Sequence, residues 1–126
     1  MSSIEQIALR FMARFNSDDL DGVIASFLED GCYIDPGNVV HQGIDAIHAA
    51  MAPLFEGEPG SSEYIITDAI FDDAASKALV NWTLQIKGDG GQVSKLDGLD
   101  ILTIKDGKIQ SKNAFCKAAE LKFEAA

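Results

Sequence analysis

The feature that most constrains this chain is the stretch 96–104, Leu-Asp-Gly-Leu-Asp-Ile-Leu-Thr-Ile, which runs into the turn sequence 105–108, Lys-Asp-Gly-Lys. Successive side chains of a strand point to opposite faces. Both faces are largely apolar here, which is typical of a central strand covered on both sides. Asp100 is the exception, because a buried carboxylate must be paired, protonated or open onto a solvated pocket. Asp100 is therefore either a functional acid or the wet end of a strand that starts later.

The chain has 126 residues, 47% of them hydrophobic, which predicts a single domain, 1–126, with its own core. It shows no apolar run of membrane-spanning length and no signal-peptide pattern, so we expect a cytoplasmic protein. Cys32 and Cys116 lack metal-ligand spacing and are interpreted as small core residues. No metal site and no cofactor are predicted. The formal charge of −10 argues against nucleic acid and anionic membranes as partners.

Three helices are predicted in the first half of the chain. Ser3 and Gln6 form a capping-box pattern ahead of apolar residues at helical spacing, and this helix ends near Asn16. A second helix, capped by Asp18 or Asp19, carries Leu20, Val23, Ile24 and Phe27, and Gly31 is placed to end it. A third opens at 43–45 and presents Ile44, Ile47, Met51 and Leu54 on one side.

The remaining pattern is extended. A short strand at 32–35 stops at Pro36, which leaves Asp35 at a rim with Tyr33 on the same face. Four more strands are predicted at 64–71, 77–87, 92–105 and 108–116, and Asp106-Gly107 is a strong hairpin signal. Helices followed by an antiparallel meander predict an α+β domain, with the N-terminal helices packed on the concave face of a curved antiparallel sheet. The order of the strands does not follow from the pattern.

Such a curved sheet encloses an apolar pocket suited to a hydrophobic small-molecule ligand. Asp35 and Asp100 are its candidate acids, and the candidate lining residues are Phe15, Tyr33, Trp82, Leu102 and Phe115. Trp82 and Phe115 fit an ordinary core equally well. His41 and His48 are interpreted as ordinary surface or capping histidines.

Several motifs carry a resemblance: Met-Ala-Arg-Phe at 12–15, Tyr-Ile-Asp-Pro at 33–36, and Leu-Asp-Ile at 99–101 followed by Gly-Lys-Ile at 107–109. Together they resemble the ketosteroid isomerases and the related polyketide cyclases of the nuclear transport factor 2-like superfamily. The resemblance implies that Asp35 is the general base for proton transfer beside a carbonyl. It also implies that Asp100 stays protonated in its apolar setting and donates a hydrogen bond to the enolate oxygen.

One departure from that family affects the expected chemistry. Phe15 stands where the isomerases have a tyrosine that donates to the oxyanion, and loss of such a donor costs about a hundredfold to a thousandfold in rate. Tyr33 is a candidate substitute. The related epoxide hydrolases use an arginine on the strands, whereas Arg10 and Arg14 lie on the first helix. The related scytalone dehydratase uses histidines on its strands, whereas both histidines here precede the meander.

Two functions remain open at this point. The first is an acid–base enzyme of the isomerase or cyclase kind that acts on a hydrophobic carbonyl compound, and the second is a ligand-binding or interaction domain without turnover. Leu99, Ile101 and Thr103 would form an apolar surface on the opposite sheet face, with Lys112 and Phe115 nearby. A homodimer through that face is expected.

Overall fold

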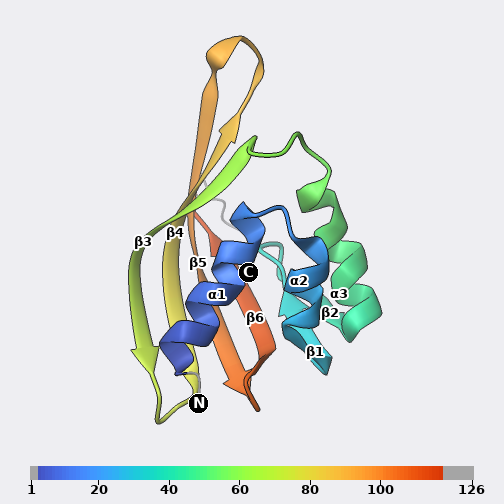
Figure 1. Ribbon diagram of the computed structural model, residues 1–126, viewed down its shortest axis with the longest axis vertical. Helices are drawn as coiled ribbons and strands as arrows, with labels where there is room; N and C mark the ends of the chain where they lie inside the picture. The colour runs from blue at the N-terminus through green and yellow to red at the C-terminus, as the bar shows by residue number, and fades with distance from the viewer. Residues whose placement is uncertain (1–2, 118–126) are drawn as a thin grey trace, which may run out of the picture.

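The computed structural model describes residues 3–117, which form a six-stranded sheet and the helices that pack on it (Figure 1). The elements, in chain order, are α1 (Ile4–Asn16), α2 (Leu20–Ala25), β1 (Phe27–Ile34), β2 (Val40–Gln42), α3 (Ile44–Met51), the 3₁₀ helix η1 (Ala52–Phe55), β3 (Ser62–Asp72), β4 (Lys77–Lys87), the 3₁₀ turn η2 (Asp89–Gly91), β5 (Val93–Lys105) and β6 (Lys108–Cys116). The predicted α+β class is confirmed. None of the helices in this described part is long and apolar enough to cross a membrane.

The strand order is β2-β1-β6-β5-β4-β3. Strands β3 to β6 form the predicted antiparallel meander, and β2 pairs antiparallel with β1. The contact between β1 and β6 is parallel, so the sheet is mixed. The turn between β5 and β6 has positive φ at both Asp106 (53°) and Gly107 (76°), as a tight hairpin turn requires.

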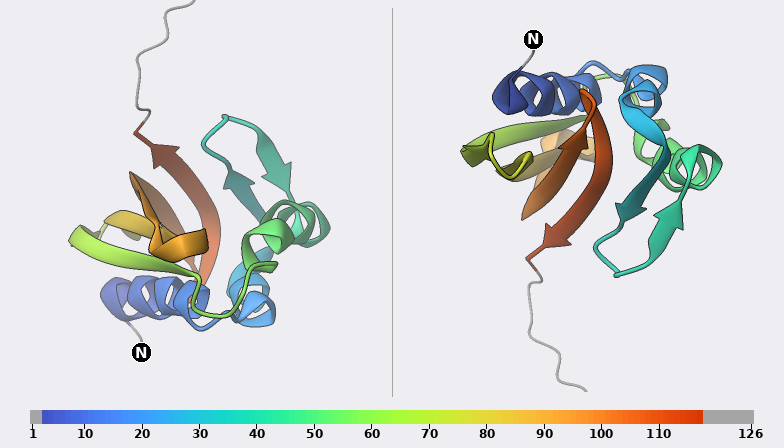
Figure 2. Two further views of the ribbon diagram at one scale, coloured as in Figure 1. Left: turned by 90° about the horizontal axis from the view of Figure 1, so that it is seen from above. Right: turned by 90° about the horizontal axis from the view of Figure 1, so that it is seen from below.

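The sheet is curved, and the helices cover its concave face (Figure 2). Helix α1 packs against β3 and β4, whereas α3 packs against β1 and β2. The side of α1 that faces the sheet carries Ala8, Phe11, Met12 and Phe15, all buried. Ser3 and Gln6 form the predicted capping box, with Ser3 Oγ accepting from the Gln6 amide at 3.1 Å.

The second predicted helix was too long. Helix α2 ends at Ala25, and Phe27, only 2% exposed, is the first residue of β1, where it pairs with Ile109 of β6. Gly31 ends no helix. It lies inside β1 beside the register shift between Phe27 and Cys32, and a Cβ there would lie 2.9 Å from the Leu28 carbonyl oxygen. Tertiary pairing with β6 therefore overrides the local helical pattern.

Candidate functional site

Asp100 lies in the interior of β5 and is fully buried. Its neighbours across the sheet are Val80 on β4 and Ala114 on β6. Because β5 begins at Val93, the alternative that Asp100 marks the wet end of a strand is wrong. A buried carboxylate in this position needs a partner.

That partner is Lys112 on β6, whose Nζ donates to Asp100 Oδ1 at 2.8 Å. The Lys112 side chain is 7% exposed and the Asp100 side chain 0%. The ammonium also lies over two aromatic rings, 5.5 Å from the Phe15 centroid and 5.3 Å from that of Tyr33, close enough for cation–π attraction. A lysine at this position is not expected from the sequence, and its ammonium is placed to compensate a charge on the carboxylate.

The prediction that Lys112 lies near the opposite face of the sheet is wrong. Thr103 pairs with Ser111, but the next residue of β5, Ile104, pairs with Ile109, so Gln110 is an extra residue in β6. Such a bulge reverses the in-and-out alternation. Ile109 and Lys112 consequently both point into the core. The bulge leaves no clear signal in the sequence.

Asp35 lies at the turn after β1, as predicted, and its carboxylate is held by three donors. Oδ1 accepts from the amides of Gly37 at 2.9 Å and Val39 at 3.0 Å. Oδ2 lies 2.9 Å from His41 Nε2. The hydrogen bond from His41, with those from the two amides, lowers the pKa of Asp35 below its ordinary value against a smaller opposing effect of burial. Asp35 therefore carries its charge at neutral pH.

His41, interpreted from the sequence as an ordinary surface or capping histidine, contacts the Asp35 carboxylate and belongs to this site. It lies on β2 directly opposite Tyr33 of β1. The two rings are stacked, with centroids 5.5 Å apart and an angle of 24° between their planes. The signal that could have found it is the turn at Pro36-Gly37, which folds the chain back and brings position 41 beside position 35.

One row of cross-strand neighbours joins the Asp35–His41 pair at the rim to the Lys112–Asp100 pair in the core. His41 pairs with Tyr33, Tyr33 with Lys112, and Lys112 with Leu102, across β2, β1, β6 and β5. Tyr33, Lys112 and Leu102 are buried, so the row runs from the rim into the core. The predicted residues Asp35, Tyr33, Leu102 and Asp100 thus belong to one continuous set of contacts.

Aromatic rings cover the buried pair. The ring of Tyr64 lies edge-on to Trp82 at 5.0 Å and to Phe15 at 5.5 Å, and Phe15 stacks on Phe55 at 5.6 Å. Trp82 lies over Gly98, the residue opposite it on β5. Phe15 and Trp82 both belong to this aromatic wall, with Tyr64 and Phe55 as additional members, and Trp82 also lines the groove on the outer face of the sheet.

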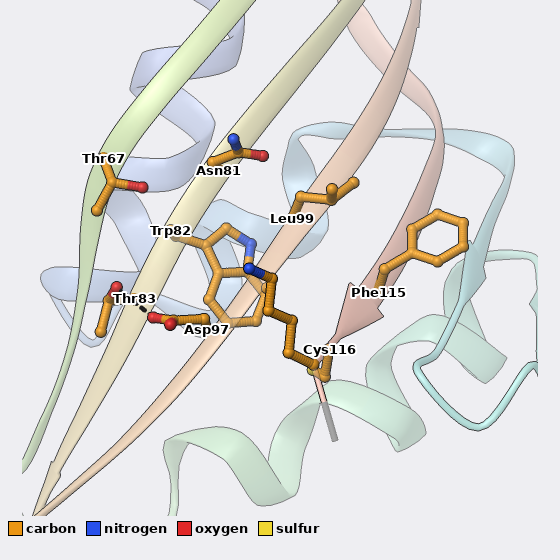
Figure 3. Close-up of a pocket in the computed structure, with 10 residues that line it drawn as sticks. Thr67, Asn81, Trp82, Thr83, Asp97, Leu99, Phe115 and Cys116 are labelled. Carbon is orange, nitrogen blue, oxygen red and sulfur yellow. Dashed lines mark hydrogen bonds between the residues drawn. The ribbon is translucent and has the colours of Figure 1, made fainter. Parts of the chain in front are cut away.

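Phe115 does not belong to this wall. It pairs with Leu99 on the outer face and is 46% exposed. Figure 3 shows it beside an outer groove of about 370 Å³, near Leu99 and Asn81, where Thr83 Oγ1 donates to Asp97 Oδ1 at 2.6 Å. The prediction that Phe115 shares a pocket with Asp100 was wrong, because alternate residues of β6 face opposite sides of the sheet.

Two buried polar atoms of the inner wall have no hydrogen-bond partner among the described residues: Asp100 Oδ2, an acceptor, and Trp82 Nε1, a donor. Buried polar atoms are normally satisfied. Burial raises the pKa of Tyr33 to about 12, with the charges of Asp35 and Asp100 adding to the effect. Burial also raises the pKa of Tyr64. Both phenols thus remain donors at neutral pH, and the inner wall offers several polar groups to a ligand.

A cavity of about 250 Å³ lies next to this wall. It is lined by Phe15, Tyr64, Phe55 and Leu84, among others, and neither Asp100 nor Asp35 reaches it. Because Phe15 also contacts Lys112 and Tyr64 also contacts Trp82, these two rings separate the cavity from the buried polar atoms. Asp35 and Asp100 are connected here by packed side chains rather than by this cavity.

The sequence matches the model of the SnoaL-like domain over residues 8–112. The chain belongs to the SnoaL-like domain family. This match spans α1 to the middle of β6 and includes Asp35, Asp100 and Lys112. The chain matches none of the curated proteins with which it was compared.

Solved structures of SnoaL-like and related proteins share this fold at low sequence identity. The epoxide hydrolase/cyclase-like enzyme SalBIII, which has a role in pyran ring formation in the polyether salinomycin, is 18% identical, with 90% of each chain covered and a TM-score of 0.78. A protein from Jannaschia sp. CCS1, named for its likeness to SnoaL-like polyketide cyclases, is 20% identical, with 90% of this chain and 84% of that chain covered and a TM-score of 0.75.

An NTF2-like protein of unknown function from Cytophaga hutchinsonii is 16% identical, with 91% of this chain and 100% of that chain covered and a TM-score of 0.69. These likenesses establish an NTF2-like fold. Within residues 3–117, no three His, Cys, Asp or Glu side chains gather in a way that could hold a metal ion.

Proposed function

We propose that this SnoaL-like protein is an acid–base enzyme that moves a proton at a carbon next to a carbonyl group of a hydrophobic small molecule. The observation that carries the proposal is the cross-strand row from the Asp35–His41 pair to the Lys112–Asp100 pair. It places a proton acceptor and a positive charge on the same face of one sheet. General base catalysis and stabilisation of an enolate oxygen need these two elements.

The rim pair acts as the base. The Asp35 carboxylate already contacts three hydrogen-bonding groups, the amides of Gly37 and Val39 and the ring of His41, and its pKa is lowered. Asp35 alone is therefore a weak proton acceptor. The Asp35 carboxylate is placed to orient the imidazole of His41 through Nε2. Imidazole is the side chain that ordinarily titrates closest to neutral pH. Asp35 therefore holds His41 in place, and His41 takes the proton.

The buried pair stabilises the oxyanion. An ammonium has three N–H donors, and Lys112 uses one of them on Asp100 Oδ1. The rings of Phe15 and Tyr64, which separate the cavity from Lys112, have to move aside to admit the substrate carbonyl to Lys112, and the apolar part of the substrate then packs against Phe15, Tyr33, Trp82 and Leu102. This cation takes the place of the hydroxyl that Phe15 lacks.

The proton transfer proceeds through an enolate. His41 takes a proton from the carbon beside the carbonyl, the C–H electrons form a carbon–carbon double bond, and the carbonyl π electrons move to the oxygen beside Lys112. Where the substrate carries a further carbon–carbon double bond conjugated with the enolate, return of the proton from His41 to the far carbon of this dienolate gives an isomer. Attack of the enolate carbon on a second carbonyl of the same molecule forms a ring, and the new alkoxide takes the proton from His41. The printed names of the cyclase relatives support the ring-forming outcome.

Exchange of carbon-bound hydrogen tests the proposal without knowledge of the natural substrate. We expect the protein to accelerate deuterium uptake beside the carbonyl of 2-tetralone in D₂O, followed by NMR. His41→Gln should slow this exchange by about a hundredfold or more, and Asp35→Asn should also slow it. His48→Gln, a change at an exposed histidine of α3, is the matched control and should leave the rate unchanged.

A ligand-binding domain without turnover is the second candidate. It is favoured by the packed rings of Phe15 and Tyr64, which separate the cavity from the ion pair. Saturable binding of 2-tetralone with an exchange rate equal to that of His41→Gln would support this candidate and reject the enzyme.

A further inference from the structure

A small pocket on the side of the molecule away from β2 gathers positive charge. It lies between α1, the end of α2 and the β5–β6 hairpin, which meet at one end of the sheet (Figures 1 and 2). The pocket holds about 140 Å³, and Arg10, Arg14 and Lys108 line it together with apolar residues, Ser26 and Gly107. Its lining includes no carboxylate. In a chain of net charge −10, this is an unusual concentration of cations.

Arg14 is fixed in this pocket by its own neighbours. Its Nη1 donates to the Gly22 carbonyl oxygen and to Ser26 Oγ, both at 2.6 Å. Arg10 lies one helical turn earlier on α1, so both guanidinium groups occupy the same face. A guanidinium whose orientation is already set loses less entropy when it binds an anion.

The cations of this pocket have no acidic partner among residues 3–117. The salt-bridge contacts within this range are Asp100–Lys112 and, where the histidine is protonated, Asp35–His41, so no described carboxylate lies within 4 Å of the charged nitrogens of Arg10, Arg14 or Lys108. An acidic residue, Asp106, lines the adjoining groove with Arg10 and Lys105. Uncompensated like charges around one concave surface repel one another, and a bound anion would relieve that repulsion.

From this geometry we infer a binding site for a phosphate group carried by a small molecule, formed by Arg10, Arg14 and Lys108. A phosphate dianion matches the planar donor forks of two arginines and the point charge of a lysine. The site is separate from the inner wall described above, so it holds whether or not the protein turns over a carbonyl compound. The net negative charge of the chain makes a phospholipid surface the less suitable source of the phosphate.

The binding of phosphate probes tests this site directly. Inorganic phosphate and phenyl phosphate are titrated into the ¹⁵N-labelled full chain in a low-salt chloride buffer. We expect saturable shifts at the backbone amides of Gly107 and Lys108 and of the last turn of α2. Raising the chloride concentration should weaken binding, as for any partly exposed charge contact.

Variants that each remove one positive charge test whether these side chains bind the phosphate. Arg10→Gln and Lys108→Gln, both at exposed positions, should each weaken phosphate binding by about tenfold. Lys95→Gln, an exposed lysine of β5 remote from the pocket, should change it less than twofold by the same measure. Equal binding by the Arg10→Gln/Lys108→Gln double variant and the unmodified protein would overturn the inference. Three other results would also overturn it: no saturable shift, shifts that chloride alone reproduces, or binding that occurs only with phosphatidic acid vesicles.

Discussion

Lys112 Nζ lies 2.8 Å from Asp100 Oδ1 in the core of the sheet, where the two side chains are 7% and 0% exposed. This pair explains how a carboxylate can occupy the centre of an apolar strand. Its charges are removed from water, so each depends on the other. The isomerase resemblance implies a protonated Asp100, and the structure adds a lysine within hydrogen-bond distance of it.

Loss of one partner should therefore be costly. Lys112→Met leaves the Asp100 carboxyl buried without its partner, and we expect a loss of about 3–5 kcal/mol in the free energy of unfolding, measured by urea denaturation. The double variant Lys112→Met/Asp100→Leu removes both charges and should recover most of that loss. A double variant no more stable than Lys112→Met would show that the ion pair is not the source of the effect.

The Asp35 carboxylate should make stability depend on acid pH. Its pKa is lower in the folded protein than its ordinary value of 3.8, so its contribution is complete above the unfolded pKa and is lost as pH falls through the folded pKa. Thermal unfolding of wild type and Asp35→Asn should accordingly differ most above about pH 4 and converge in stronger acid. In His41→Gln, the NMR titration of the Asp35 carboxyl should move upward, because the largest cause of the lowering is removed. A titration unchanged by His41→Gln contradicts the assigned contact.

The contact between Trp82 and Gly98 should tolerate no added methyl group. A Cβ at position 98 would lie 2.7 Å from Trp82 Cζ2 and would also clash with the Phe115 carbonyl oxygen. Gly98→Ala is therefore expected to lose about 1–3 kcal/mol of stability and to shift the fluorescence of Trp82, the single tryptophan of the chain. Gly88→Ala is the control, since its nearest neighbour, the Gln92 carbonyl oxygen, is 3.8 Å from the added Cβ. Equal effects of the two substitutions would rule out the tight approach at Gly98.

The outer face of the sheet should mediate a homodimer, which we propose from its apolar side chains. Phe115 is 46% exposed and pairs with Leu99, and Ile101 lies on the same face, partly exposed. Light scattering after size-exclusion chromatography should give twice the chain mass of 13.5 kDa. Phe115→Asp should give the monomer, whereas Glu63→Gln, an exposed change at the far strand β3, should not. A monomeric wild type rejects the proposed dimer.

Local sequence was sufficient where local interactions decide structure. The Ser3–Gln6 cap, the periodicity of α1, the four meander strands and the Asp106-Gly107 turn all depend on neighbours within a few residues. The odd position of Asp100 in an apolar strand likewise marked it as exceptional, because a buried charge always requires compensation.

The tertiary structure decided what depends on distant pairing. The parallel contact of β1 with β6 drew Phe27 out of a helical pattern and into the sheet. The extra residue Gln110 turned Lys112 inward to meet Asp100, and the turn after β1 brought His41 to Asp35. In each case the deciding energy comes from residues far apart in the chain or from a single-residue change of register, neither of which a local pattern records.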